Sequence, residues 1–382
     1  YPFQIAFQLL NLRGLCALEE GDPGRMGEED ERSIVDLAWF PTGGGKTEAY
    51  LGLISMVGFY RRLRFPEREL LPSVHVIMRY TLRLLTSDQA DRLVRLAVGM
   101  NHVSETMGSE MGAKSFDGSD FPPFRVGMWV GGGVSPRDLL MGPKGDENSA
   151  QGRLRAIRKG DEEPGEGSVM QFEVCPWCGE RGEESLSNPD NWDVVDGTGR
   201  GDFDWSSDLN GRATLRGRCH AEGCKMNEYV PFTCVDEDIY LNPPSILLAT
   251  VDKFVQLSNN PRPRTAFEYI KNDKERMKRS KECDARGMLG FERKGVKTRA
   301  PDLVIQDELH LLTGPLGTLG GLFETGIHVA WAKQGHAPKY IAATATIRGA
   351  EKDSTLMYGR KLNIFPPPME DANDNFFAKA NN

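Results

Sequence analysis

Hydrophobic residues along this chain gather in short β-branched runs, separated by stretches with helical periodicity. Six runs are typical of buried strands, at positions 34–40, 74–78, 126–130, 245–250, 303–306 and 340–345. After the first run, residues 48–62 repeat apolar side chains at Leu51, Ile54 and Val57, the spacing of one helix face. Alternating strands and helices predict an α/β fold with a doubly wound, mostly parallel sheet.

Two polar segments interrupt this alternation. Residues 142–167 are rich in glycine, acidic residues and asparagine, and cysteine pairs follow until strand-like sequence resumes near Pro243. This pattern predicts an insertion inside one α/β domain, and the charged stretch 262–300 is interpreted as a smaller insert. The predicted divisions are a discontinuous domain over 1–140 and 235–365, an insertion over 141–234 and a linker over 366–382.

Composition narrows the class of protein. With 382 residues, 39% of them hydrophobic, the chain can build the cores of about two domains. No apolar run approaches the roughly 20 residues of a membrane span, and the N-terminus lacks a signal-peptide pattern. We therefore expect a cytoplasmic protein with no membrane partner. Because the chain begins at Tyr1 rather than Met, we also expect a piece of a longer protein.

The net charge of −8 does not by itself indicate nucleic-acid binding, which depends on Lys and Arg neutralising phosphates. The distribution of charge is more informative. Between Arg262 and Arg299, 13 basic and 6 acidic residues give a local net charge of +7. Two interpretations stay open: an electrostatic footprint for nucleic acid, and a solvated helix face or flexible insert.

The most specific motif lies between the first predicted strand and the first predicted helix. It reads Phe40-Pro41-Thr42-Gly43-Gly44-Gly45-Lys46-Thr47. Its glycines let backbone N–H groups curl round phosphates, and the helix N-terminus adds the positive end of its dipole. We expect Lys46 to reach the outer phosphates of ATP and Thr47 to ligate Mg²⁺. The strict pattern has glycine where Phe40 stands, and a purely structural glycine turn is the alternative.

A second element of nucleotide chemistry follows the predicted strand 303–306, which ends in Asp307 and Glu308. Asp307 is expected to hold the magnesium ion, and Glu308 to orient and deprotonate the attacking water. The alternative is structural, because acidic side chains are favourable just before a helix. The phosphate loop upstream favours the catalytic interpretation, with Lys46, Asp307 and Glu308 as the catalytic residues.

Four of the seven cysteines form two close pairs, Cys175 with Cys178 and Cys219 with Cys224. In a cytoplasmic chain, close pairs indicate metal binding rather than disulfides. Four thiolates complete a tetrahedral Zn²⁺ site of structural type, which predicts a zinc-ribbon-like insertion. His220 and Cys234 are rival ligands, and free, buried thiols are the alternative.

Together these motifs make nearly all of the chain outside the insertions resemble the first RecA-like domain of a superfamily-two helicase. Residues 40–47 resemble motif I, and Asp307-Glu308-Leu309-His310 resembles motif II in a DEAH-like spelling. Thr344-Ala345-Thr346 resembles motif III, which in such enzymes couples hydrolysis to strand movement. The resemblance implies coupling roles for His310, Thr344 and Thr346.

Weaker motifs resemble the family's strand-binding and base-reading segments. Segments 79–89, 131–133 and 249–254 resemble motifs that contact the nucleic-acid backbone. The implied contact residues are Arg79, Thr81, Gly132, Thr250 and Lys253. For each, a solvated loop residue is the alternative. The first four residues resemble the adenine-reading motif, in which Gln4 would pair with the base edge and Gln8 is the alternative reader.

The spelling of motifs I and II, with an inserted cysteine cluster, is most similar to the large helicase subunit of the bacterial DISARM anti-phage system. This resemblance implies an ATP-dependent DNA helicase or translocase that acts with a partner subunit in a defence complex. It also implies a second RecA-like domain in the parent chain, which would supply an arginine finger.

Other functions stay open from the sequence. RNA is an alternative to DNA as the nucleic acid. One rival is an ATPase that remodels a protein or nucleoprotein complex without unwinding, and another is a zinc-bearing adaptor with an inert nucleotide switch. The intact Lys46, Asp307 and Glu308 argue against the adaptor, because an inert site has no chemical need for a water-activating acid.

Overall fold

A computed structural model describes residues 2–19, 21–22, 30–39, 45–69, 72–80, 83–107, 121–131, 135–140, 148–163, 168–195, 214–255, 257, 263, 299–312, 314–332, 335–344 and 355–367. The chain forms two compact units. The first comprises 1–60, 75–81 and 300–382, and the second comprises 61–74 and 82–299.

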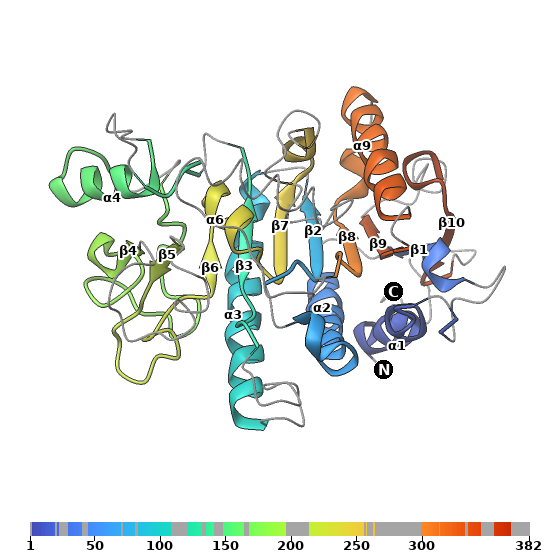
Figure 1. The fold of residues 1–382 in the computed structure, drawn as a ribbon, viewed down its shortest axis with the longest axis horizontal. Helices are drawn as coiled ribbons and strands as arrows, with labels where there is room; N and C mark the ends of the chain where they lie inside the picture. The colour runs from blue at the N-terminus through green and yellow to red at the C-terminus, as the bar shows by residue number, and fades with distance from the viewer. Residues whose placement is uncertain are drawn as a thin grey trace, which may run out of the picture. The chain divides into compact units, whose positions relative to one another are not determined.

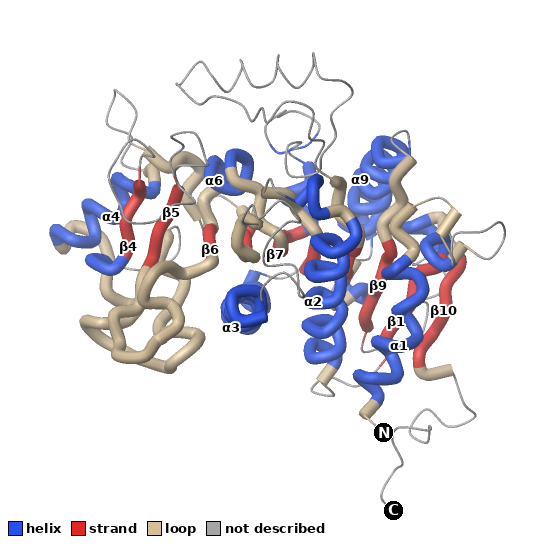
Figure 2. The backbone as a smooth tube through the Cα atoms, turned by 60° about the horizontal axis from the view of Figure 1, so that its bottom comes forward, coloured by secondary structure: helices blue, strands red, loops and turns tan. Residues whose placement is uncertain are grey.

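The first unit is a layered α/β structure. Its strands, in sheet order, are β10 (Lys361–Phe365), β1 (Ile34–Trp39), β9 (Lys339–Thr344), β8 (Leu303–Gln306) and β2 (Val76–Tyr80). All neighbouring pairs are parallel. Helices α1 (Phe3–Cys16) and α2 (Lys46–Arg64) lie on one side of these strands and α9 (Gly314–Ala332) on the other (Figure 1 and Figure 2). Because the strands are parallel, their carboxyl ends meet at one edge, where loops of different origin come together.

Buried ion pairs hold the amino ends of these strands. Arg32, in the 3₁₀ turn η2 (Glu31–Ser33) before β1, donates to Asp302, which precedes β8, at 3.1 Å, and both side chains are fully buried. Lys339, the first residue of β9, pairs with Asp36 of β1. Breaking one partner of a buried pair leaves an uncompensated charge, so these contacts fix how β1, β8 and β9 align.

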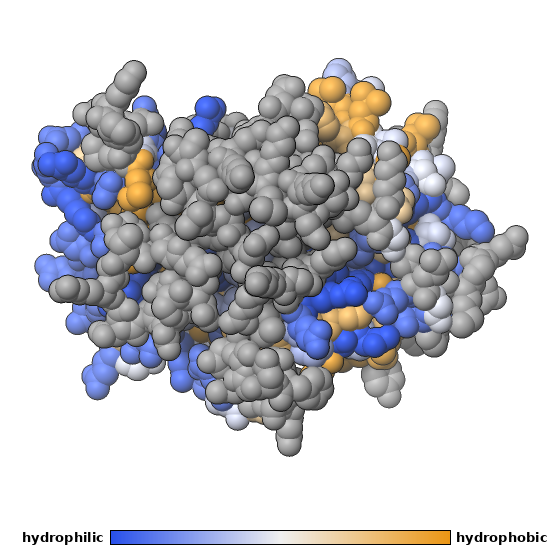
Figure 3. Space-filling view, in the orientation of Figure 1, coloured by the Kyte–Doolittle hydropathy of each residue, from blue (hydrophilic) through white to orange (hydrophobic). Residues whose placement is uncertain are grey.

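Helix α9 carries exposed apolar side chains, while its buried residues are Gly320, Glu324 and Trp331. Leu319, Leu322 and Val329 are 49%, 65% and 45% exposed. Apolar colour gathers over this helix at the top of the space-filling view (Figure 3).

In its described residues, the second unit combines three parallel strands with a small hairpin. The parallel strands are β7 (Ile246–Thr250), β3 (Val126–Trp129) and β6 (Phe232–Thr233). The hairpin pairs β4 (Trp192–Val195) with β5 (Thr214–Gly217) in antiparallel register. The helical elements are η3 (Pro66–Glu69), α3 (Arg83–Met107), α4 (Ala150–Lys159), η5 (Pro189–Asn191), α6 (Asp236–Leu241) and η6 (Val251–Val255).

The α/β class with parallel strands is confirmed, and all six predicted strands form. The strand predicted at 303–306 matches β8 residue for residue, whereas the one predicted at 74–78 lies two residues later, at β2. β10 and β6 were not predicted. The two residues of β6 are too few for a periodic signal, and the polar Lys361 and Asn363 interrupt the apolar run of β10. The proposed domain boundaries stay a prediction. In the part of the chain that the structure describes, no helix is long and apolar enough to cross a membrane.

Candidate functional site

The predicted phosphate loop precedes helix α2, and Gly45 and the two residues that follow it are the part of that loop which the structure describes. Thr42, Gly43 and Gly44 lie outside the described residues, as do Phe40 and Pro41. Gly45 has φ +79°, a left-handed conformation that favours glycine, and a Cβ there would stand 2.6 Å from the Nε2 of Gln4, so the end of that side chain would have to shift. Lys46 starts α2 and is 8% exposed. The lysine and Thr47 therefore occupy the first turn of a helix, where backbone N–H groups and the positive end of the helix dipole favour an anion.

Both glutamines of α1 reach toward the start of α2. The Nε2 of Gln4 donates to the carbonyl of Gly45 at 3.4 Å. The Nε2 of Gln8 donates to the carbonyl of Ala49 at 3.3 Å. These contacts join α1 to the end of the phosphate loop, and adenine recognition by Gln4 or Gln8 stays a prediction.

The acidic pair stands at the carboxyl end of β8. Asp307 is 6% exposed, and the backbone N–H of Glu308 donates to its Oδ1 at 2.9 Å. The hydroxyl of Tyr80 donates to its Oδ2 at 2.9 Å. Both carboxylate oxygens thus have a fixed donor, and each keeps lone-pair capacity for a cation or its water.

Glu308 has a strained backbone. Its φ of 49° and ψ of 46° lie in the left-handed region, which costs a residue with a Cβ on the order of 1 kcal/mol. Strain of this kind persists where the surrounding structure holds it, and it is concentrated at functional sites. The conformation lets the chain turn sharply from β8 into η8 (Leu309–Leu311) immediately after the acids.

A polar chain links Glu308 to β9. The Nδ1 of His310 is 3.3 Å from an Oε2 of Glu308 and 3.3 Å from the hydroxyl oxygen of Thr344. The parallel register pairs Gln306 with Ala342, which brings the ends of β8 and β9 to the same edge. The structure therefore brings Glu308, His310 and Thr344 together, whereas Thr346 lies outside the described residues.

Two tyrosines near the acids were missed by sequence reasoning. Tyr50, on α2, is fully buried, and its hydroxyl has no hydrogen-bond partner among the described residues. Burial raises the pKa of Tyr50 well above its ordinary value, and the charges of Asp307 and Glu308 raise it further. Burial likewise raises the pKa of Tyr80, followed by the effect of Asp307. The position of Tyr80 at the end of β2 was the available signal, since parallel strand ends share an edge.

In the first unit, Arg79 was predicted to contact nucleic acid, but its side chain is buried inside the fold. Arg79 is 7% exposed and ion-pairs with Glu324 of α9. The hydroxyl of Tyr340 donates to the other oxygen of the same carboxylate. Burial lowers the pKa of Arg79, but Glu324 outweighs it and the net shift is upward. Arg79 contact with a nucleic acid stays a prediction, and Thr81 lies outside the described residues.

The predicted contacts of the second unit are also buried. The Nζ of Lys253 lies 2.8 Å from Asp236 and 5.9 Å from the ring centre of Trp129. Thr250 ends β7 and is fully buried. Their contact with nucleic acid stays a prediction, and Gly132 lies outside the described residues.

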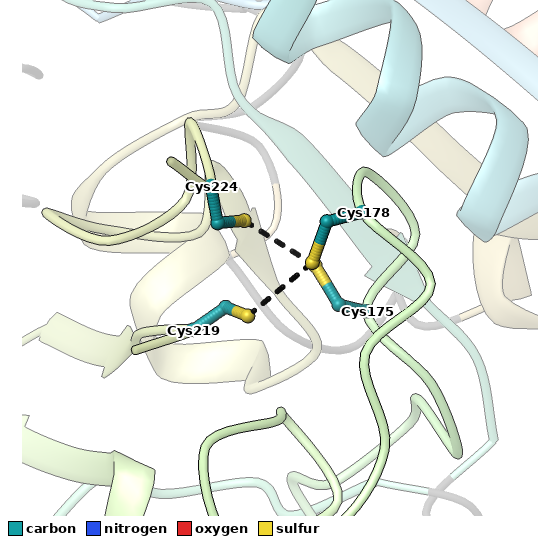
Figure 4. Close-up of side chains that lie close together, drawn as sticks. All are labelled: Cys175, Cys178, Cys219 and Cys224. Atoms are coloured by element: carbon teal, nitrogen blue, oxygen red, sulfur yellow. Dashed lines mark hydrogen bonds between the residues drawn. The ribbon is translucent and has the colours of Figure 1, made fainter. Parts of the chain in front are cut away.

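The four predicted zinc ligands converge in the second unit (Figure 4). Their Sγ atoms all lie within 4.8 Å of one another. Cys175 is 3.7 Å from Cys224, and Cys178 is 3.7 Å from Cys219, measured between sulfur atoms. Four sulfurs at about 2.3 Å from one zinc ion stand roughly 3.8 Å apart in a tetrahedron, whereas a disulfide needs about 2.0 Å. The donor set therefore fits a Zn²⁺ ion.

The two rival ligands do not belong to the cluster. Cys234 lies with its Sγ 3.9 Å from the carbonyl of Val169, and His220 is exposed. Among the described residues, the group of potential metal ligands contains neither of them. The cluster is thus of the four-cysteine type that the spacing predicts.

Tight turns and a tryptophan support the cysteine cluster. Gly179, with φ of +78°, directly follows Cys178, and Gly223, with φ of +71°, directly precedes Cys224. The ring of Trp192 is fully buried, and its Nε1 donates to the carbonyl of Leu186 at 2.8 Å. Gly217 faces Trp192 across the hairpin, where a Cβ would stand 2.7 Å from the ring. This packing fixes the hairpin beside the second cysteine pair.

Three consecutive acids of α6 anchor the second unit. Asp238 is fully buried and accepts from Arg125 and Thr214, and from the backbone N–H of Leu215. Glu237 accepts from the backbone N–H of Leu139 at 2.8 Å. Together with the ion pair between Asp236 and Lys253, these contacts tie α6 to β5, to η6 and to Arg125, the residue before β3.

No protein-family model matches the chain. One curated protein, however, aligns with the whole chain. The chain is similar to the DISARM protein DrmA. It is 35% identical over 406 residues to DrmA of Bacillus paralicheniformis, in an alignment that covers all of this chain and 32% of the relative. The predicted resemblance to a DISARM protein is confirmed, and the chain spans about a third of the length of this DrmA.

Solved structures of the DUF1998 helicase MrfA also align with the chain, at 11% identity. The TM-score is 0.41 for MrfA without DNA, over 96% of this chain and 30% of MrfA. It is 0.41 for MrfA bound to DNA, over 95% and 25%, and 0.38 for MrfA bound to DNA and AMPPNP, over 87% and 24%.

Proposed function

We propose that this chain is the ATP-binding motor domain of a DNA helicase or translocase that acts in bacterial anti-phage defence. The similarity to DrmA supports the defence role, because that relative is a DISARM protein. A cytoplasmic location and a partner subunit of the defence complex belong to the same proposal.

One observation carries the motor assignment: Glu308 is linked through His310 to Thr344. A carboxylate that only capped a helix would need no such chain to the next strand. A water-activating carboxylate gains from it, because events at the bound nucleotide can then shift β9. This geometry supports the coupling roles of His310 and Thr344.

The chemistry is phosphoryl transfer to water. Lys46 would contact the outer phosphates, Thr47 and Asp307 would hold Mg²⁺, and Glu308 would take the proton of the attacking water. Bound Mg²⁺ would neutralise the charge that develops on the phosphate oxygens. We expect this chain alone to bind ATP and hydrolyse it slowly, because an arginine finger would come from a second RecA-like domain of the parent protein.

The four-cysteine site would hold Zn²⁺ as a structural ion, because all four positions are filled by protein sulfurs. Residues 262–299, with their net charge of +7, are a further candidate for DNA contact.

The test is the ATPase rate of the full parent protein, titrated with single-stranded DNA, duplex DNA and RNA. We expect DNA to raise the rate, and we expect both Lys46→Ala and Glu308→Gln to remove the stimulated turnover. Equal rates for Lys46→Ala and wild type would refute the assignment. An active ATPase that no nucleic acid stimulates would instead support a protein-remodelling ATPase.

A further inference from the structure

Tyr80 contacts the acidic pair through a bond that the proposed roles of Lys46, Asp307 and Glu308 leave unexplained. It ends β2 and is 1% exposed. Its hydroxyl donates to the Oδ2 of Asp307 at 2.9 Å. A buried hydrogen bond to a carboxylate is among the stronger single contacts in a protein, and it also sets the direction of the carboxylate.

The backbone places Tyr80 beside Asp307 independently of that hydroxyl. β2 and β8 are parallel, with Arg79 opposite Gln306. The N–H of Asp307 donates to the carbonyl of Arg79 at 3.1 Å, and the side-chain amide of Gln306 donates to the same carbonyl. Removing the hydroxyl would therefore leave the main chain of Asp307 in place and free only its carboxylate.

The type of donor matters for a cation site. A lysine or arginine at this position would cancel the charge that a metal ion needs, whereas a neutral phenol fixes the carboxylate and leaves its charge. The N–H of Glu308 fixes the other oxygen in the same neutral way. Outer partners of this kind commonly orient metal-binding carboxylates.

We propose that Tyr80 is a positioning residue that holds the Asp307 carboxylate in the orientation required to bind the magnesium of a nucleotide–magnesium complex. This inference rests on the proposed ATPase function. It assigns a role to the end of β2 other than contact with nucleic acid.

Tyr50 offers a matched control. It is as deeply buried as Tyr80 and belongs to the same unit, yet its hydroxyl has no hydrogen-bond partner among the described residues. Tyr50→Phe removes one buried hydroxyl near the acids without breaking a bond to them, and Tyr80→Phe removes one with that bond.

The experiment measures equilibrium binding of a fluorescent ATP analogue to the purified protein as Mg²⁺ is titrated, with a second series in EDTA. For Tyr80→Phe, we expect the Mg²⁺ concentration at half-saturation to rise about tenfold, the loss expected for a hydrogen bond to a charged group. Binding in EDTA should match wild type, because it does not involve the metal. Tyr50→Phe should match wild type in both series, and thermal melting should show that both variants are folded.

An unchanged Mg²⁺ requirement in Tyr80→Phe would overturn the inference while leaving the ATPase proposal intact. An equal shift in Tyr50→Phe would also overturn it, because the effect would then not depend on the bond to Asp307. If wild-type protein binds no nucleotide at any Mg²⁺ concentration, both this inference and the proposed function fail.

Discussion

In the first unit, Asp307 accepts hydrogen bonds from other protein groups. In the second unit, the thiols of Cys175, Cys178, Cys219 and Cys224 lie chiefly against one another. We call Gly45, Lys46, Thr47, Asp307, Glu308, His310 and Thr344 the nucleotide region. The segments 168–195 and 214–234 are the cysteine region. In the nucleotide region, Asp307 accepts from Tyr80 and from a backbone N–H. In the cysteine region, the four Sγ atoms converge on one another.

This difference has a physical consequence. Parallel strands and protein hydrogen bonds hold the acids of the nucleotide region in place through the protein's own contacts. Thiols are weak hydrogen-bond donors, and the cysteine region offers mainly short strands and turns to hold them. We therefore expect metal to be a condition of folding in the cysteine region and only a ligand in the nucleotide region.

The largest expected effect is loss of the zinc site. Cys219→Ser should abolish stoichiometric zinc and unfold the cysteine region, because structural zinc contributes on the order of 10 kcal/mol. Metal analysis and limited proteolysis measure the two outcomes. Nucleotide binding should persist if the two regions are as different as proposed.

Cys234→Ser is the control for that experiment. Cys234 is equally buried, but its Sγ lies near the carbonyls of Ser168 and Val169 rather than in the cluster. The Cys234→Ser variant should therefore bind zinc in the same amount as wild type. Stoichiometric zinc in Cys219→Ser would contradict the four-cysteine assignment.

The second effect concerns the buried charge that anchors the cysteine region. Asp238→Ala should lower the free energy of unfolding by about 3–5 kcal/mol, because it leaves Arg125 buried without its counter-ion. Chemical denaturation measures this loss. Asp193→Ala, at an exposed position on β4, should change it by less than about 0.5 kcal/mol. A similar small change in both variants would mean that the ion pair does not anchor the region.

The third effect is confined to the nucleotide region. Glu308→Gln should reduce DNA-stimulated turnover by about 10²- to 10³-fold, the scale of a lost general base. It should leave nucleotide binding and zinc content unchanged. Glu67→Gln, on the exposed side of η3, is the control and should hydrolyse ATP like wild type. Turnover near the wild-type rate in Glu308→Gln would mean that another residue is the general base.

The smallest effect is a pH dependence of the second unit. Burial, followed by the charge of Asp88, raises the pKa of Asp91 to about 6. The folded state therefore binds a proton at Asp91 more tightly than the unfolded state. The free energy of unfolding falls as Asp91 loses that proton, between about pH 4 and pH 6. Asp91→Asn should therefore be more stable than wild type at pH 7.5 by about 1 kcal/mol, a value reduced for partial solvent screening. At pH 4 the two should match, and an equal difference at both pH values would exclude titration of Asp91 as the cause.

Much of the nucleotide region could be predicted because its chemistry is local in sequence. Lys46 and Thr47 follow a glycine run, and Asp307 and Glu308 follow one apolar strand. The cysteine spacing was equally local, so the four ligands could be named before their sulfurs were seen to meet. Tyr50 could not be named, because a buried helical tyrosine next to an acid has no sequence pattern. Tyr80 had only its place at a strand end as a signal, and that place does not show which acid it contacts.

The residues predicted to contact nucleic acid show what a sequence pattern does not reveal. Arg79 and Lys253 look like solvent-facing basic residues in sequence, yet each forms a buried ion pair with a partner far along the chain or on another element. A sequence pattern marks where a charge stands, but its partner depends on which elements pack together. Contact of Arg79 and Lys253 with a nucleic acid stays a prediction.

By itself, the sequence determined the α/β class and named the four cysteines that cluster, and it predicts a phosphate loop and a catalytic acidic pair. These depend on hydrophobic periodicity and on short spacings, which act over a few residues. Only the tertiary structure decided that Tyr80 fixes Asp307, that His310 joins Glu308 to Thr344 and that Arg79 is paired with Glu324. Those contacts join separate strands and helices, so they follow from the register and order of the sheet, which no local pattern specifies.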